Sequence, residues 1–270
     1  RTELGGAVEG ITTEDLIVEE DMVVTVSHHG YIKRNALTQY RAQHRGGKGV
    51  KGMAAREEDF VERLFVASTH AYILFFTTRG RAHWLKVHEL PQLGRAARGR
   101  SLANVLSLAE GERVRATLPV RSFEDVADDH VLLCTRNGVV KKTTLDAYAN
   151  PRRGGIIAIK LDPSDELIAA SRTNGRQEVL IASRDGKSIR FQEERVRAMG
   201  RAAAGVRGMT LRASDHVVGM EILSPAATVL TVTEKGYGKR TPLDDYRVQR
   251  RGGQGVITIR TSARNGPVVS

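Results

Sequence analysis

Residues 178–191 read EVLIASRDGKSIRF. The segments 178–182 and 187–191 carry the β-branched, alternating pattern of two strands. Between them, Asp185-Gly186 is a turn dipeptide of the kind that closes tight hairpins, because glycine readily adopts a positive φ. This stretch therefore predicts an antiparallel β-hairpin.

The hairpin belongs to a longer unit. Residues 166–170 read as a preceding strand, residues 200–208 form a loop rich in glycine and arginine, and residues 209–211 begin another strand. The unit therefore holds about four short antiparallel strands in about 50 residues.

Two sets of glycines show that the unit is repeated. The turn glycines are Gly30, Gly80, Gly138, Gly186 and Gly236. The loop glycines are Gly49, Gly99, Gly155, Gly205 and Gly255, at intervals of 50, 56, 50 and 50 residues. We expect a single domain over 1–270 with repeats at roughly 14–59, 60–111, 112–164, 165–214 and 215–264, and with 265–270 as the start of a possible sixth blade.

Short antiparallel strands repeated at this period predict an all-β, propeller-like fold, with a linear solenoid as the alternative. The order of strands within a blade, and any exchange of strands between neighbours, are left open. Hydrophobic residues recur seven and ten positions after the turn glycine and are expected to anchor the core: Leu37, Tyr40, Val87, Leu90, Leu145, Tyr148, Val196, Leu243 and Tyr246. Pro119 predicts an edge or bulged strand, because proline cannot donate to a ladder.

The formal net charge of +11 is unevenly distributed. Five windows around the loop glycines, at 39–56, 91–104, 149–161, 195–212 and 246–260, hold 20 Lys and Arg and no Asp or Glu. The rest of the chain carries a net charge of −9. Clustered positive charge is typical of nucleic-acid binding.

The loop composition suits phosphate. Glycines allow the backbone to approach an anion closely, and arginine offers a planar fork of donors to phosphate oxygens. Such contacts hold a nucleic-acid backbone without reading bases. A P-loop is excluded, because a strand rather than a helix follows the glycines.

At residues 43–49 (QHRGGKG) and 249–255 (QRRGGQG) the chain resembles the C-terminal DNA-wrapping domain of the bacterial DNA gyrase A protein. That family carries the box Gln-Arg-Arg-Gly-Gly-Arg/Lys-Gly in its first blade. Here His44 replaces an arginine, and Gln254 occupies the sixth position of the second copy. The resemblance implies a β-pinwheel of up to six propeller-like blades that share strands. The related topoisomerase IV domain is an alternative, but it lacks an intact box.

The resemblance further implies that duplex DNA wraps around a basic rim, for ATP-dependent negative supercoiling by the full enzyme. Partners would be the rest of the gyrase A protein and the gyrase B protein, in the bacterial cytoplasm and associated with the nucleoid. ATP and magnesium are expected only in the full enzyme, with no cofactor and no metal in this chain. The isolated domain is expected to be monomeric.

Candidate DNA contacts fall into two groups. The loop group comprises Arg41, Gln43, Arg45, Gly46, Gly47, Lys48, Gly49, Lys51, Arg95, Arg98, Arg100, Arg152, Arg153, Arg201, Arg207, Arg250 and Arg251. The strand group lies three and four residues after the turn glycines and comprises Lys33, Arg34, Lys141, Lys142, Arg190, Lys239 and Arg240. In the second repeat these two positions hold His83 and Trp84, and Trp84 is expected to pack rather than to stack on a base.

The sequence argues against catalysis in this chain. Its eight histidines lack metal-ligand spacing such as HExxH, and there is no Gly-x-Ser-x-Gly elbow. Cys134 is the single cysteine, lies in an apolar strand and is expected to be a core residue in a reducing compartment. No signal peptide or membrane span is expected. A propeller that binds protein partners is the remaining alternative.

Overall fold

The computed structural model describes residues 13–40, 52–53, 59–124, 126, 128–150, 152 and 154–270. The chain divides into two compact units, and each is described by itself. The first unit comprises Arg1–Ile73, Leu85–Ser107 and Pro119–Arg121, and the second comprises Leu74–Trp84, Leu108–Leu118 and Ser122–Ser270.

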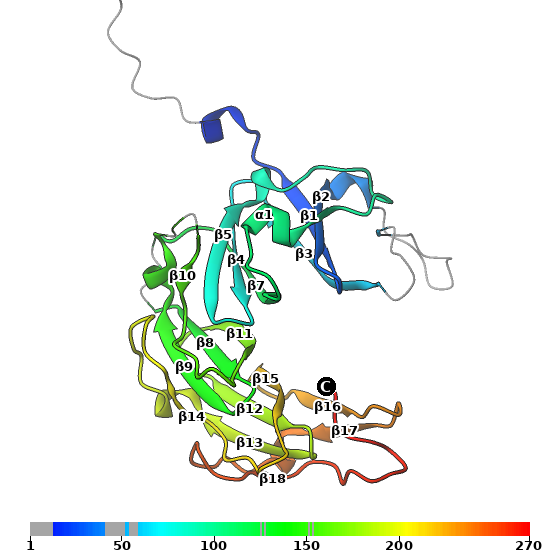
Figure 1. Cartoon of the computed structure of the whole chain (residues 1–270), viewed down its shortest axis with the longest axis vertical. Coiled ribbons are helices and arrows are strands. Elements are labelled where there is room, and N and C mark those ends of the chain that lie inside the picture. Colours follow the sequence, from blue (N-terminus) through cyan, green and yellow to red (C-terminus); the bar gives the residue numbers. More distant parts are fainter. Residues whose placement is uncertain are drawn as a thin grey trace, which may run out of the picture. The chain divides into compact units, whose positions relative to one another are not determined.

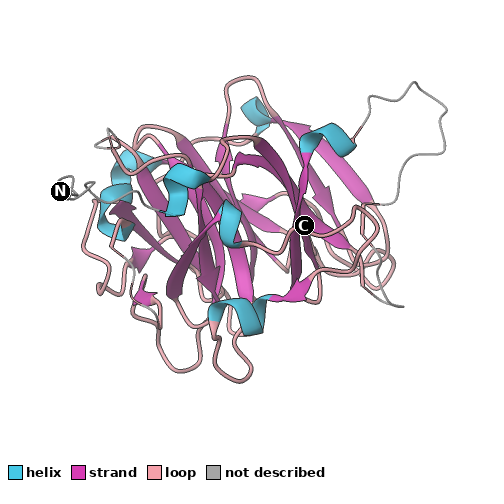
Figure 2. Ribbon diagram, turned by 90° about the horizontal axis from the view of Figure 1, so that it is seen from above, coloured by secondary structure: helices cyan, strands magenta, loops and turns pink. Residues whose placement is uncertain are grey.

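Antiparallel strands dominate the described residues, as Figure 1 and Figure 2 show, which confirms the expected all-β class. The first sheet has the order β3-β1-β2-β6 and contains β1 (Asp21–Ser27), β2 (Tyr31–Ala36), β3 (Val61–Ser68) and β6 (Arg100–Ser101). The second has the order β10-β5-β4-β7 and contains β4 (Tyr72–Thr77), β5 (Arg81–Lys86), β7 (Val114–Val120) and β10 (Ile156–Ile157). β7 is an edge strand and carries Pro119, as expected.

Three further sheets belong to the second unit. The third has the order β11-β8-β9-β14 and contains β8 (His130–Thr135), β9 (Val139–Thr144), β11 (Leu167–Thr173) and β14 (Val206–Arg207). The fourth has the order β15-β12-β13-β18 and contains β12 (Glu178–Ser183), β13 (Lys187–Gln192), β15 (Val217–Leu223) and β18 (Val256–Ile257). The fifth pairs β16 (Thr228–Val232) with β17 (Gly238–Pro242), and Val268 forms an isolated bridge with Thr233.

Strands are exchanged between successive repeats, which resolves the question that the sequence left open. In the fourth sheet, the hairpin β12–β13 comes from one repeat, whereas the flanking strands β15 and β18 come from the next. The third sheet is built in the same way from β8–β9 flanked by β11 and β14. Each of these sheets therefore requires strands from two successive repeats.

The core of the second unit lies between the third and fourth sheets. Leu132, Cys134 and Val140 of one sheet pack with Val179 and Ile181 of the other, and all five are fully buried. Cys134 is a core residue as predicted, and burial raises the pKa of its thiol. The aligned apolar faces of successive sheets thus hold the second unit together through burial of apolar surface.

Short 3₁₀ turns follow the second hairpin strands: η2 (Leu37–Gln39), η3 (Val87–Glu89), η4 (Leu145–Tyr148), η5 (Glu193–Arg195) and η6 (Leu243–Asp245). The anchors Val87, Leu90, Leu145, Tyr148, Val196, Leu243 and Tyr246 are buried, as expected. The prediction is wrong for Leu37, which is 39% exposed. The described residues contain one α-helix, α1 (Leu102–Leu106). None of the described helices is long and apolar enough to span a bilayer.

Carboxylates lock the hairpin turns. Asp165 Oδ1 accepts hydrogen bonds from the backbone N–H of Asn137 at 3.0 Å and of Glu166 at 2.9 Å. Asp215 accepts in the same way from Asp185 and His216. Each also ties the start of one repeat to the hairpin of the repeat before it.

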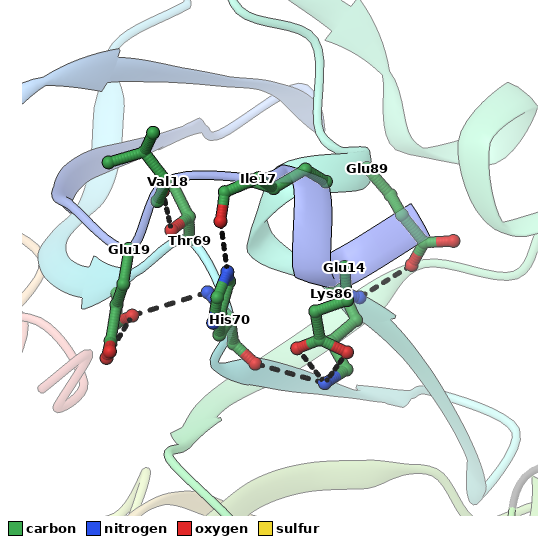
Figure 3. Close-up of polar contacts among 9 residues, drawn as sticks. Glu14, Ile17, Val18, Glu19, Thr69, His70, Lys86 and Glu89 are labelled. Atoms are coloured by element: carbon green, nitrogen blue, oxygen red, sulfur yellow. Dashed lines mark hydrogen bonds and ion pairs between the residues drawn. The ribbon is translucent and has the colours of Figure 1, made fainter. Parts of the chain in front are cut away.

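In the first unit, η1 (Thr13–Leu16) and the segment after it are held by polar contacts that Figure 3 shows. Lys86 Nζ lies 2.6 and 2.9 Å from the two carboxylate oxygens of Glu14. The same ammonium lies 3.9 Å from the centre of the Tyr72 ring. The Thr69 hydroxyl donates to Val18 O at 2.9 Å. Although burial opposes the charge, Glu14 and Tyr72 raise the pKa of Lys86. This segment is therefore fixed to the first unit by an ion pair that is only partly exposed.

Candidate nucleic-acid interface

We call the segments 93–99, 199–205 and 249–255, with residues 152, 154 and 155 of the third repeat, the basic loops. Each of the segments 93–99, 199–205 and 249–255 begins directly after a residue that forms a parallel β-bridge with the second hairpin strand of the preceding repeat. The bridged pairs are Arg34 with Gln92, Lys142 with Ala198, and Arg190 with Val248. Each ends at a two-residue antiparallel strand on the same partner: β6 on β2, β14 on β9, and β18 on β13. The loops are thus clamped at both ends along the outer edge of a sheet.

The loops close on themselves in tight turns. Ala97 N–H donates to Gly94 O at 2.9 Å, and Ala203 N–H donates to Gly200 O at 3.1 Å. Gly205 has a φ of +92°, and a Cβ atom at this position would lie 2.7 Å from Val140 O. A glycine is required there because the loop backbone passes directly against the strand below it.

Successive basic loops of the second unit are hydrogen-bonded to the neighbouring repeat. Lys160 N–H donates to Ala203 O at 3.2 Å, and Thr210 N–H donates to Gly253 O at 2.9 Å. The guanidinium of Arg251 donates to Arg207 O at 3.0 Å. The third, fourth and fifth repeats therefore present their basic segments side by side along one edge of the second unit.

Three arginines of the second unit line one cleft of about 450 Å³. Arg81 comes from β5, Arg152 from the third repeat's loop, and Arg201 from the fourth repeat's loop. Arg81 Nη2 donates to the carbonyl oxygens of Gly154 at 2.6 Å and Gly155 at 3.0 Å. No carboxylate is among the described residues that line the cleft. Positive charge without neutralising acids makes this cleft a candidate anion site.

His83 lies beneath this cleft. It is 5% exposed, and Gly155 passes so close that a Cβ atom would lie 2.6 Å from the ring carbon Cε1. Burial lowers the pKa of His83, and the nearby Arg81 lowers it further, while Glu112 acts in the opposite direction. The cleft's charge at neutral pH therefore comes from its arginines.

The predicted loop residues fall into three groups. Arg41, Gln43, Arg45, Gly46, Gly47, Lys48, Gly49, Lys51 and Arg153 lie outside the described residues. Arg100, Arg152, Arg207 and Arg250 are exposed, and Arg95, Arg98, Arg201 and Arg251 are half-buried. The guanidinium of Arg98 stacks on the Tyr31 ring at 3.8 Å.

The predicted strand residues Lys33 and Lys141 are buried, with 0% exposure. Lys33 Nζ donates to the carbonyl oxygens of Gly94 and Arg95, and Lys141 Nζ donates to those of Ala158 and Arg201. Burial lowers the pKa of Lys33, and burial with the nearby Arg201 lowers that of Lys141 to about 8. The expectation that these lysines are available to contact phosphate is wrong, because the next repeat's loop covers them.

Lys142, Arg34 and Arg190 hold the 3₁₀ turns of the next repeat. Arg34 donates to the carbonyl oxygens of His88 and Leu90, and Arg190 to those of Leu243 and Tyr246. Lys142 Nζ lies 3.8 Å from the buried Glu193 carboxylate. These three side chains serve the packing of repeats. Lys142 is buried, so the prediction of a surface contact is wrong for it, while DNA contacts by the half-buried Arg34 and Arg190 stay predictions.

Lys239 and Arg240 on β17 are exposed, as expected for available cations. Lys239 Nζ donates to Thr258 O at 3.2 Å. Trp84 is half-buried. Arg81 was not predicted, because it lies just after a turn glycine and outside the loop windows. No cluster of three or more His, Cys, Asp or Glu side chains suited to a metal occurs in the described ranges.

The tandem sheets with shared strands define a propeller-like all-β protein. Residues 21–68, 71–121, 129–174, 177–224 and 227–270 match the family described as DNA gyrase C-terminal domain, beta-propeller, and the chain belongs to this family. It is 49% identical over 269 residues to the DNA gyrase A protein of Salmonella typhimurium, and 46% identical over 269 residues to that of Escherichia coli. The matches cover 100% of this chain and 30% of each relative, so the chain spans less than a third of their length.

Solved structures agree on the fold. The C-terminal domain of a DNA topoisomerase IV superposes with a TM-score of 0.79 at 29% identity, covering 93% of this chain and 76% of that one. A DNA gyrase A C-terminal domain superposes with a TM-score of 0.72 at 24% identity, covering 92% of this chain and 81% of that one. The curated relatives, which are DNA gyrase A proteins, support the gyrase assignment over the topoisomerase IV alternative.

Proposed function

We propose that the chain binds duplex DNA along its basic loops without reading the sequence, bends it, and provides a wrapped segment for negative supercoiling by a DNA gyrase. The supporting observation is the contact between successive basic loops in the second unit, from Lys160 and Ala203 to Arg207 and Arg251. Arginines so placed can contact consecutive phosphates along one duplex. Contacts of this kind position DNA but do not specify bases.

Simple magnitudes support the proposal. Bending about 40 bp of duplex through half a turn costs roughly 10 kcal/mol, given a persistence length of about 150 bp. About two phosphate contacts per repeat give about ten contacts, and so a slope of log K against log salt of about −9. Affinity should therefore be high at low salt and fall steeply as salt rises, with weak sequence preference.

The larger role is proposed from the family. Strand cutting, and ATP hydrolysis with magnesium, would belong to the rest of the gyrase A protein and to the gyrase B protein, in the bacterial cytoplasm near the nucleoid. This chain would then act as a DNA-binding part without catalysis of its own, monomeric when isolated. Arg45 and Lys48, outside the described residues, are proposed to affect wrapping more than simple binding, because other loops still hold DNA.

The test is to seal a nicked DNA circle with ligase while the chain is bound. Wrapping of one hand leaves a topoisomer distribution shifted to positive writhe, whereas a distribution centred on that of free DNA contradicts wrapping. A gel-shift series in salt is run in parallel. A DNA affinity that is weak and insensitive to salt would instead favour a propeller that binds protein partners.

A further inference from the structure

We infer that the buried lysines three residues after a turn glycine, Lys33 and Lys141, are positioning residues for the arginines of the next repeat's basic loop. The inference rests on the proposed function, since the arginines are taken to contact DNA. Each lysine fixes the backbone of the arginine, and so sets where its guanidinium can reach.

The contacts recur at equivalent positions of two repeats. Lys33 Nζ donates to the carbonyl oxygen of Arg95, and to that of Gly94 at 3.2 Å. Lys141 Nζ donates to the carbonyl oxygen of Arg201, and to that of Ala158 at 2.5 Å. Arg95 and Arg201 each lie four residues before a loop glycine, Gly99 or Gly205. Each ammonium therefore holds the backbone of the same loop position.

A structural role alone does not account for a lysine at this position. In the fourth sheet the equivalent residue is Ile189, three residues after Gly186, and it is fully buried. Its Cδ1 atom lies 3.6 Å from where a Cβ of Gly253 would be, beneath the loop. The fold thus accepts an apolar side chain at this position. A buried lysine at the same position is costly unless its ammonium is hydrogen-bonded. What the lysine adds is a hydrogen bond to the loop backbone, which in both repeats includes the carbonyl oxygen of the arginine.

The arginine above Ile189 behaves differently. Arg251 uses its own guanidinium as an anchor, donating from Nε to Arg195 O at 2.8 Å and from Nη1 to Arg207 O at 3.0 Å. Above Lys141, the guanidinium of Arg201 has no hydrogen-bond acceptor among the described residues and lines the arginine cleft. Above Lys141, the arginine's donors are thus available for a phosphate, whereas above Lys33 Arg95 also donates from Nη1 to Gln39 O at 3.3 Å.

The experiment is a double-mutant cycle in the 270-residue chain, with Lys141→Met, Arg201→Ala and both together. Affinity for a duplex of about 40 bp is measured over a salt series, and bending by energy transfer between dyes on the duplex ends. We expect Lys141→Met to weaken binding about tenfold, the loss of about one charge-assisted contact. The salt slope should become shallower by about 0.9.

The cycle separates positioning from packing or bulk charge. If Lys141 acts through Arg201, Lys141→Met has no further effect on DNA affinity once Arg201 is alanine. Additive losses would overturn the inference. Ile189→Met is the matched control and should leave affinity and slope unchanged. If Lys141→Met fails to fold, the same cycle with Lys33→Met and Arg95→Ala decides the question.

The unmodified chain tells failure of the inference apart from failure of the proposed function. If it binds DNA with a steep salt slope but the cycle is additive, only the positioning role is overturned. If it shows no salt-dependent DNA binding, the proposed function fails and the inference fails with it.

Discussion

Arg251 donates from Nη1 to the carbonyl oxygen of Arg207 at 3.0 Å, joining the basic loop of the fifth repeat to the β14 strand of the fourth. The contact is made through the backbone of Arg207, so the exposed Arg207 side chain remains directed at solvent. The side chain of Arg251 connects two repeats, whereas the side chain of Arg207 is a candidate phosphate contact. Residue type alone does not distinguish the two roles.

The first prediction concerns the arginine cleft. Arg152→Gln should weaken binding to duplex DNA and make the slope of log K against log salt shallower by about 0.9, because one phosphate contact is lost. Gel shifts over a salt series measure both quantities. Arg184→Gln is the matched control, since this exposed arginine lies on a hairpin turn outside the basic loops. Equal effects of the two changes would argue against a special role for the cleft.

The second prediction concerns Gly205. Gly205→Ala should lower the free energy of unfolding by about 1–3 kcal/mol, because a positive φ strains any other residue, and because the new Cβ would lie 2.7 Å from Val140 O. Gly200→Ala is the control, since a Cβ there meets nothing within 4 Å. Denaturant unfolding compares the two. A Gly205→Ala variant as stable as Gly200→Ala would contradict the described loop conformation.

The third prediction concerns the buried pair of Lys142 and Glu193. Lys142→Met should lower the free energy of unfolding by about 3 kcal/mol, because it leaves a carboxylate that is 0% exposed without its cation. Adding Glu193→Leu should recover part of the loss, since other repeats carry leucine at this position. Thermal and denaturant unfolding of the single and double variants provide the measurement. If the second change destabilises further, the pair is not the main reason for the loss.

The fourth prediction concerns pH. Burial and the nearby Arg201 lower the pKa of Lys141 to about 8, below its ordinary value of 10.5. Between these two values the unfolded chain binds more protons than the folded chain, so the contribution of Lys141 to stability rises with pH over that window. The difference in unfolding free energy between wild type and Lys141→Met should therefore increase from about pH 8 to about pH 10. A difference that stays flat or falls over this range would be inconsistent with a depressed pKa.

The repeat and its hairpins could be read from the sequence because their signals are local. Asp185-Gly186 and the alternating residues around it specify a turn and two strands without help from the rest of the chain. The loop windows were recognised for the same reason, since arginine and glycine cluster there without acids.

The burial of the lysines and arginines on the second hairpin strands could not be predicted from the sequence, because the segment that covers them belongs to the neighbouring repeat. Lys141 stands on a strand whose outer edge is exposed in an isolated hairpin but is covered by the next repeat's loop once strands are shared. Glu193 shows the same dependence: it breaks the hydrophobic pattern, and its partner Lys142 belongs to the previous repeat. Arg81 was missed because only the fold brings it beside Arg152 and Arg201.

Because repeats share strands, a sheet can be completed during translation only after part of the next repeat has been synthesised. The hairpin of β1 and β2 ends at Ala36, but β6, which completes its sheet, ends at Ser101. At about 5–20 residues per second, the ribosome needs roughly 3–13 s to supply the missing strand. During that interval β2, which carries Lys33 and Arg34, is an unpaired edge strand. Positive charges on such an edge discourage pairing with a neighbouring nascent chain. Lys33 and Arg34 would thus first keep the newly synthesised hairpin from pairing with other chains, and would connect successive repeats once β6 has formed.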